Sequence, residues 1–234
     1  GHWNWPIRLS HQQAVSCGQM IWVGGQMALS AGGLAGNAGD LPKQVAMCLG
    51  SVKHVLAQFG CGFEDMVKLL CFYVNDGSVD EDNFLSMVGA ALPRGSCPAI
   101  TAVPTPYLAY PGIRVVIEAY AMIAEDGGAL PRSFAPADGL TPMPQPFASA
   151  VRCGKMIFVS GQSPIDVARN VLHPGDILAQ TKQVMSQIAR ALAGFGAGFP
   201  DVVKMNRWYV GAGKTEDFEP AALACAENYS EPGP

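Results

Sequence analysis

The hydrophobic positions of this chain follow two spacings, one typical of helices and one of buried strands. Between Asp40 and Gly60 the apolar side chains recur every three or four residues, as on one face of a helix. Asp40 as cap and Pro42 as first-turn proline suit the start of this helix, and Gly60 suits its end. Apolar runs without that spacing predict strands. The predicted order is strand 20–25, helix 40–60, strand 66–74, helix 80–91, strand 113–123, strand 156–161, helix 177–194, strand 202–210 and helix 216–228.

This order occurs twice because the chain contains an internal repeat. Residues 14–25 resemble residues 150–161, and the offset of 136 then holds without a net gap. Val67–Lys68, for example, corresponds to Val203–Lys204. A constant register predicts two copies of one small domain.

We therefore expect an α+β fold of two tandem domains, residues 1–124 and 147–234, joined by a Gly- and Pro-rich linker at 125–146. Each domain should be a sheet with two helices on one face, which leaves the other face to be buried against further copies. Pro98 corresponds to Pro234, so the second copy lacks its final strands. We expect truncation or disorder after Pro234, or a second polypeptide that completes the copy, which proteolytic processing could produce.

Composition narrows the classes of partner. The net charge is −4 without any block of Lys or Arg, which argues against a nucleic-acid surface. No apolar run reaches the ~18 residues that span a membrane, and no signal peptide is visible, so we expect a cytoplasmic protein. Charged residues make up only 15% of the chain, which favours a homo-oligomer. The seven Cys form no C-x-x-C pair and the four His are scattered, so we expect no metal.

Several short strings carry a resemblance to a known family. They are G-x-M-I-x-x-x-G-Q in both copies, V-K-x-x-x-[FW]-Y-V after the first helix of each, and P-R-G-S-C and I-R-V-V-I-E-A in the first copy. With these strings the chain resembles the Rid/YjgF family of reactive-intermediate deaminases. The resemblance implies a chorismate-mutase-like α+β fold, and trimers with sites in the clefts between subunits. For this chain we expect a trimer or a pseudo-trimer of repeats, and chemistry without a metal or cofactor.

The resemblance also implies site residues. The family uses a Cys that matches Cys97 and a Glu in the final strand that matches Glu118. Its carboxylate-binding Arg falls on Gly95, with Arg94 one position earlier. The position of its Tyr is taken by His11.

The family's Ser before Gly-Gln is Gly24 in the first copy and Ser160 in the second. The Tyr position of the second copy is Phe147. These departures leave open whether each copy has a working site.

Each candidate also has a plain structural explanation. A Glu within so apolar a strand is costly unless paired or functional, so Glu118 either activates water or pairs with Arg114 on the same strand face. Arg94 could hold a substrate carboxylate or be a solvated loop residue, with Arg114 as the reserve holder. Cys97 could be a nucleophile or a small buried hydrophobe. His11 could shuttle protons or lie at the surface, and Ser160 could bind ligand or only backbone.

The leading hypothesis is hydrolytic deamination of a small enamine or imine acid to a keto acid and ammonia. The first alternative is a non-catalytic small-molecule-binding scaffold of the same fold. The second is an amide hydrolase matured by cleavage after Pro234, with a new N-terminal nucleophile on a second chain.

Overall fold

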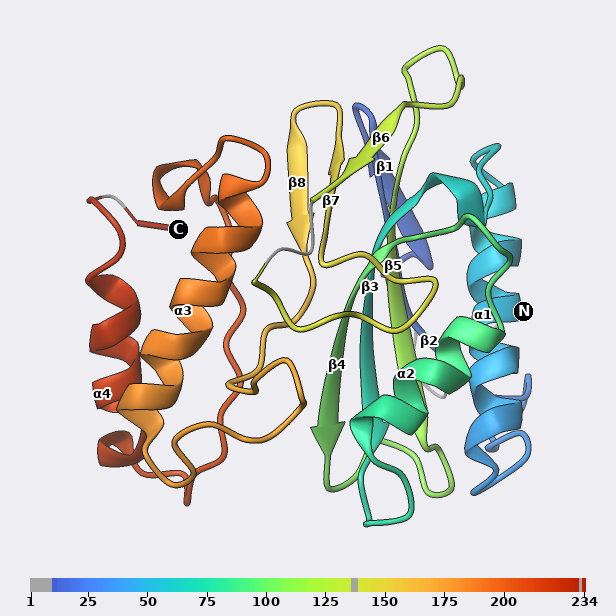
Figure 1. Ribbon diagram of the computed structural model, residues 1–234. Coiled ribbons are helices and arrows are strands. Elements are labelled where there is room, and N and C mark those ends of the chain that lie inside the picture. The colour runs from blue at the N-terminus through green and yellow to red at the C-terminus, as the bar shows by residue number, and fades with distance from the viewer. Residues whose placement is uncertain (1–9, 136–138, 232) are drawn as a thin grey trace.

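The computed structural model describes residues 10–135, 139–231 and 233–234, and it contains two units that correspond to the two repeats (Figure 1). The elements of the first repeat are β1 (Ala14–Cys17), β2 (Met20–Met27), α1 (Leu41–Ala57), β3 (Met66–Val74), α2 (Glu81–Ala90), β4 (Ala99–Thr105) and β5 (Val115–Met122). The strands and helices predicted in this half are therefore confirmed, and the fold is α+β.

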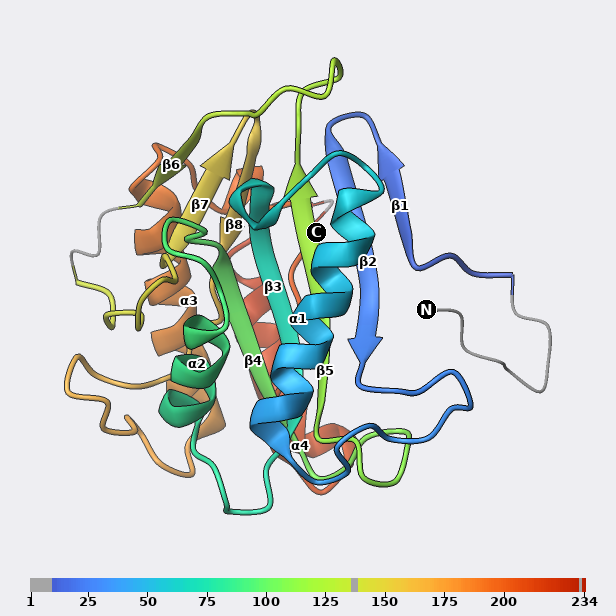
Figure 2. The ribbon, with the colours of Figure 1, turned by 90° about the vertical axis from the view of Figure 1, so that its right-hand side faces the viewer.

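The five strands of the first repeat form one mixed sheet in the order β1–β2–β5–β3–β4. β3 and β4 are parallel, and the other neighbours are antiparallel. Both helices cover one face of this sheet (Figure 2). Asp40 caps α1 by accepting a hydrogen bond from the backbone N–H of Lys43 at 3.1 Å. The main core lies between the helices and the sheet, where Val45, Val52 and Leu56 are fully buried.

The second repeat has a smaller sheet. Its elements are β7 (Ala150–Cys153), β8 (Met156–Val159), α3 (Ile177–Ala193) and α4 (Thr215–Ala226), and β6 (Arg132–Phe134) pairs antiparallel with β7. β6 lies inside the segment predicted to be an unstructured linker. The Gly and Pro content of that segment hid the strand, because only its pairing with β7 defines it.

The strand predicted at 202–210 is not formed, which corrects the prediction. In the first repeat β5 lies between β2 and β3 and pairs with both. The described part of the second repeat has no counterpart of β5, so 202–210 has no strand beside it and runs as an extended segment. The apolar pattern of 202–210 is typical of a strand, but a strand forms only beside a partner strand.

The second repeat packs against the face of the large sheet that the helices leave uncovered (Figure 1). Val151 and Cys153 of β7 join Met20, Val67 and Met122 in a small buried core between the repeats. On the side of α2, Arg169 forms an ion pair with Asp82. The sheet face that was expected to be buried by another copy is thus partly buried by the neighbouring repeat.

Two kinds of feature are absent from residues 10–135, 139–231 and 233–234. None of the helices within the described residues is long and apolar enough to cross a bilayer. In the same residues no three His, Cys, Asp or Glu side chains lie close enough together to hold a metal ion.

Candidate functional site

Glu118 lies on the sheet face that looks toward the second repeat. Along β5 the side chains alternate, because successive residues of a strand point to opposite faces. Ile117 and Ala119 are fully buried beneath the helices, whereas Glu118 and Tyr120 are partly buried on the other face. The Tyr120 hydroxyl donates a hydrogen bond to Glu118 Oε2 at 3.3 Å. Burial, together with the neighbouring Glu118, raises the pKa of Tyr120 to about 12, so the hydroxyl remains a donor at neutral pH.

A β-bulge lies directly opposite Glu118. The pairing of β2 with β5 passes from Val23 opposite Ala119 to Gln26 opposite Ile117, so Gly24 and Gly25 together face one residue. A Cβ on Gly25 would lie 2.7 Å from Val116 Cγ1, which explains a glycine there. Bulges are common beside active sites because they change the direction of nearby side chains. The bulge therefore marks the surroundings of Glu118 as a specialised part of the sheet.

Strand β3 supplies the next row of side chains. Leu70 is the register partner of Glu118, and Lys68 is the partner of Tyr120. Phe72 is the following residue of β3 on this face. The sheet therefore places a carboxylate, a phenol and an ammonium group beside two apolar side chains.

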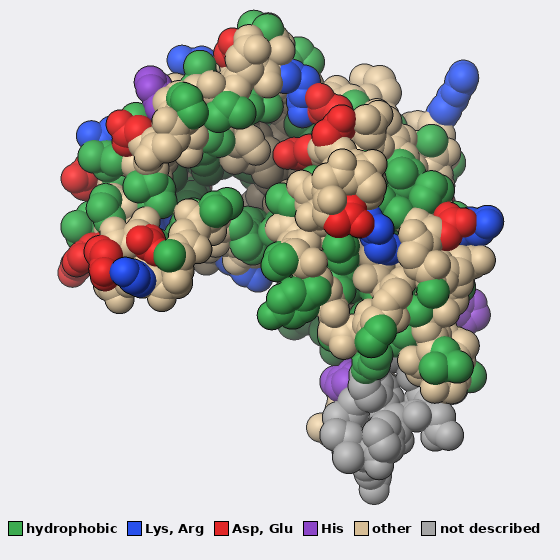
Figure 3. Space-filling model, turned by 90° about the horizontal axis from the view of Figure 1, so that it is seen from below, with side chains coloured by type: hydrophobic (Ala, Val, Ile, Leu, Met, Phe, Trp, Pro, Cys, Tyr) green, Lys and Arg blue, Asp and Glu red, His purple; other side chains and the backbone are tan. Residues whose placement is uncertain are grey.

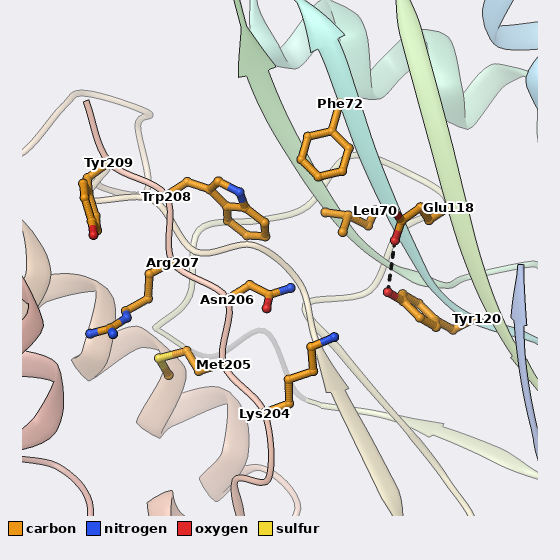
Figure 4. A pocket seen from close by; sticks show the side chains of 10 residues that line it. All are labelled: Leu70, Phe72, Glu118, Tyr120, Lys204, Met205, Asn206, Arg207, Trp208 and Tyr209. Carbon is orange, nitrogen blue, oxygen red and sulfur yellow. Dashed lines mark hydrogen bonds between the residues drawn. The ribbon is translucent and has the colours of Figure 1, made fainter. Parts of the chain in front are cut away.

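The second repeat closes the opposite side of a cleft of about 530 Å³. The extended segment Lys204–Tyr209 forms this wall, and Leu70, Phe72, Glu118 and Tyr120 form the other. Figure 4 shows that Lys204, Asn206 and Trp208 point toward the sheet, while Met205, Arg207 and Tyr209 point away. Seen from below, the molecule is hollowed between the two repeats, and hydrophobic side chains border the hollow (Figure 3).

The aromatic and basic residues of the two walls come from equivalent positions of the repeat. Phe72 and Trp208 make an edge-to-face contact with ring centroids 6.3 Å apart. Lys68 and Lys204 also approach each other. Lys68 donates a hydrogen bond to the carbonyl of Val159 at 2.7 Å. Burial, with a smaller contribution from the Lys204 ammonium, lowers the pKa of Lys68 to about 8.

The arginines proposed to bind a carboxylate lie elsewhere. Arg114 forms an ion pair with Asp76 at 2.9 Å and donates to Ser78 Oγ at 3.0 Å. Glu118 therefore does not share the ion pair with Arg114 that the structural explanation required. Arg94 is exposed in the turn after α2. Neither arginine lines the cleft.

Cys97 follows that turn and has a strained backbone. Its φ of +41° is rare for a residue with a Cβ, and such strain clusters at functional sites. Cys97 is partly buried, between the buried Ser96 and Pro98. The guanidinium of Arg132 holds this turn by donating to the backbone carbonyls of Ser96 and, at 3.2 Å, Gly95. An arginine from the predicted linker thus reaches the loop where the family's arginine would stand.

The two remaining candidates differ in setting. His11 is exposed before β1. Ser160 is buried, where its hydroxyl donates to the carbonyl of Ala148 at 2.7 Å and accepts from the N–H of Ile100 at 2.8 Å. These bonds give Ser160 a structural role at the junction of the repeats. Its predicted contact with a ligand stays a prediction, as does proton transfer by His11.

Sequence reasoning did not propose Tyr120, Lys204, Asn206 or Trp208 as site residues. Tyr120 was signalled only by its place two residues after Glu118, on the same strand face. Lys204 and Trp208 belong to the motif V-K-x-x-x-[FW]-Y-V, which indicated the repeat and the family resemblance but no site residue. That they face Glu118 depends on how the repeats pack.

A family model described as Endoribonuclease L-PSP matches residues 7–123 and again residues 141–232. The chain belongs to the Rid/YjgF family. The double match agrees with the tandem arrangement, and each repeat accounts for one copy of the Rid/YjgF unit.

Individual relatives match one part of the chain. A RutC family protein of Pyrococcus abyssi is 43% identical over 61 residues, which are 26% of this chain and 48% of the relative. The 3-aminoacrylate deaminase RutC of Acinetobacter baylyi is 32% identical over 73 residues, 31% of this chain and 58% of the relative. The 2-iminobutanoate/2-iminopropanoate deaminase of Capra hircus is 36% identical over 59 residues, 25% of this chain and 43% of the relative. The chain spans about half the length of these curated relatives.

Solved structures likewise match about half of this chain. A member of the YjgF/YER057c/UK114 family from Mycobacterium tuberculosis covers 49% of this chain and 88% of its own, with 22% identity and a TM-score of 0.41. A Rid family protein from Yersinia pestis covers 45% and 80%, with 27% identity and a TM-score of 0.42.

Proposed function

We propose that this chain hydrolyses a small reactive enamine or imine acid to the corresponding keto acid and ammonia, in the cleft between its two repeats. The observation that carries the proposal is the placement of Glu118, a carboxylate in an otherwise apolar strand, inside a cleft of a Rid/YjgF protein. Relatives whose names specify 3-aminoacrylate and 2-iminobutanoate deamination support the same reaction class.

The reaction requires only a few protein groups. The imine carbon of R₂C=NH accepts a water molecule, the C–N bond of the resulting carbinolamine breaks, and R₂C=O and NH₃ leave. Glu118 would take a proton from the attacking water and return it to the departing nitrogen. Tyr120 orients the carboxylate through its hydrogen bond, and the cleft limits the positions that substrate and water can adopt.

Two other functions receive less support. The name of the matching family model refers to RNA cleavage, but a chain with a net charge of −4 and no basic block offers little for RNA to bind. A non-catalytic binding protein is the stronger alternative, because Gly95, His11 and Gly24 replace the Arg, Tyr and Ser expected from the resemblance.

Ammonia release distinguishes deaminase from scaffold. Imino acids are produced in the assay by an amino-acid oxidase, and their disappearance is compared with and without the protein. We expect Glu118→Gln to lower kcat by about 10²-fold or more, because the amide keeps the shape but cannot accept the proton. Glu125→Gln, at an exposed position, is the matched control. A Glu118→Gln protein with wild-type turnover would remove Glu118 from the mechanism, and a wild-type protein without turnover would favour the scaffold.

A further inference from the structure

The wall that the second repeat contributes to the cleft is built in an unusual way. Residues 203–211 are extended, and their backbone groups form no hydrogen bond with any described residue. Alternate side chains fix the segment instead. Tyr209 stacks on Phe218 of α4 at 5.5 Å, and Met205 Sδ accepts a hydrogen bond from Tyr229 at 3.2 Å. Because these residues anchor one side, Lys204, Asn206 and Trp208 are presented to the cleft.

Lys204 is the cation best placed to meet a substrate anion. The charged residues that line the cleft are Glu118, Lys204 and Arg207, and Arg207 points away from it (Figure 4). The Lys204 ammonium makes no hydrogen bond or ion pair within residues 10–135, 139–231 and 233–234. Lys68, close by, adds a second positive group. Of the two arginines proposed to bind a carboxylate, Arg114 forms an ion pair with Asp76, and Arg94 is exposed outside the cleft.

One end of the cleft carries apolar side chains, and the cleft as a whole is larger than a three-carbon acid requires. Phe72 and Trp208 form one corner, and Leu70 extends it along the sheet. The volume of about 530 Å³ lies within the range of about 300–1,000 Å³ typical of pockets for drug-sized ligands. Trp208 is 46% exposed, so one side of its indole ring is available to a ligand. Aromatic rings gain stability from offset or edge-to-face contacts with such a pair.

The order of these groups along the cleft matches one class of substrate. Lys204 and Trp208 are four residues apart in an extended segment, which separates their Cα atoms by about 13 Å. Asn206 lies between them and points toward the side of the cleft that holds Glu118 (Figure 4). A ligand could therefore place a carboxylate at Lys204, a C=N group near Glu118, and a side chain against Trp208 and Phe72.

We propose that Lys204 binds the substrate carboxylate and that Trp208 with Phe72 selects imino acids with a bulky apolar side chain, preferably aromatic. As a statement about turnover, this rests on the proposed deaminase function. As a statement about binding, it can be tested alone, because the keto acid product carries the same carboxylate and side chain.

The test measures the Kd of phenylpyruvate and pyruvate by calorimetry, with quenching of tryptophan fluorescence, compared between the wild-type protein and Trp208→Leu, as a second readout. Phenylpyruvate should bind at least about tenfold more tightly than pyruvate, from the burial of its ring. Lys204→Gln should weaken both acids by about tenfold, and Lys204→Arg should restore most of the loss. Trp208→Leu should remove the preference while leaving pyruvate nearly unchanged. Lys182→Gln, an exposed lysine on α3, is the control.

Binding and turnover then separate the two proposals. Selective binding of phenylpyruvate without ammonia release supports the ligand site and rejects the deaminase. Ammonia release with equal binding of the two keto acids, or with affinities unaffected by Lys204→Gln and Trp208→Leu, overturns the ligand assignment and leaves the deaminase standing. Circular dichroism of each variant verifies that it is folded, and both positions are exposed, so their replacement should not affect the core.

Discussion

At the scale of single residues, strand alternation explains most of the site. Glu118 was predicted from sequence because a carboxylate among Val, Ile and Ala side chains needs a reason, and the structure places it in a cleft. Arg114 was considered its partner since both lie on one strand face, yet Asp76 holds Arg114 at the strand end. Periodicity gives the face of a side chain, but not which neighbour lies within reach.

Lys68 gives a prediction about stability. Its pKa falls from the ordinary 10.5 to about 8 on folding, so between these values the unfolded chain binds more protons than the folded one. The resulting cost to stability is fully present below pH 8 and disappears as the pH rises to 10.5. We expect Lys68→Met to raise the free energy of unfolding at pH 7 by about 1 kcal/mol, a modest value because the side chain is only partly buried.

Urea unfolding of both proteins at pH 7 and pH 9.5 measures this effect. The gain should shrink at the higher pH, where Lys68 of the wild-type protein is largely neutral when folded. The buried thiols titrate in both proteins. Their contribution therefore cancels when the free energies of unfolding of the two proteins are subtracted. If Lys68→Met raises the free energy of unfolding equally at both pH values, or lowers it at pH 7, burial of the charged Lys68 does not destabilise the folded protein.

At the scale of elements, the bulge in β2 and the unpaired segment 202–210 carry the most information. The bulge was not predicted, because in the sequence Gly24 and Gly25 marked the end of a strand and Gly24 the position of the family's Ser. The bulge is thus a structural feature that no sequence pattern indicated. Segment 202–210 is the opposite case, because its apolar pattern is typical of a strand although no strand forms there in the described structure. Both depend on neighbouring strands, and local sequence does not contain that information.

The bulge predicts a contrast between adjacent glycines. Gly25→Ala would place its methyl group 2.7 Å from the stiff side chain of Val116, whereas the methyl of Gly24→Ala meets only the Gln13 carbonyl at 3.5 Å. We expect Gly25→Ala to destabilise the protein by about 1–3 kcal/mol. Gly24→Ala should change stability by less than about 0.5 kcal/mol. Equal melting temperatures for the two variants would contradict the bulge geometry.

At the scale of the whole molecule, the internal repeat made the fold predictable and the packing of the repeats made the site unpredictable. The four helices, the strands β2, β3, β5 and β8, the cap of α1 and the tandem arrangement followed from spacing and register, whereas β1, β4, β6 and β7 were not predicted. Lys204 and Trp208 lie more than 80 positions after Glu118 in sequence and meet it only because the second repeat covers the open face of the first. No local pattern encodes that contact.

The same packing leaves room for assembly. Several large apolar side chains of the second repeat remain exposed, among them Val203, Val210 and Leu223. Contiguous exposed apolar surface favours association. We therefore predict a homo-oligomer, with light scattering at micromolar concentration giving a multiple of the 24.6 kDa chain mass, most simply three. A monomer mass across that concentration range would refute the prediction.

The central claim is that one active cleft is shared by both repeats, and its most direct test removes only the second repeat's side of it. The triple variant Lys204→Ala, Asn206→Ala, Trp208→Ala leaves Glu118, Tyr120 and the large sheet untouched. Its kcat/KM for ammonia release from the imine of phenylpyruvate should fall by about 10²-fold or more, with an unchanged circular dichroism spectrum, while Lys182→Ala behaves as wild type. If the folded triple variant keeps kcat/KM within about twofold of the wild-type value, the chemistry does not take place in a cleft shared by the two repeats.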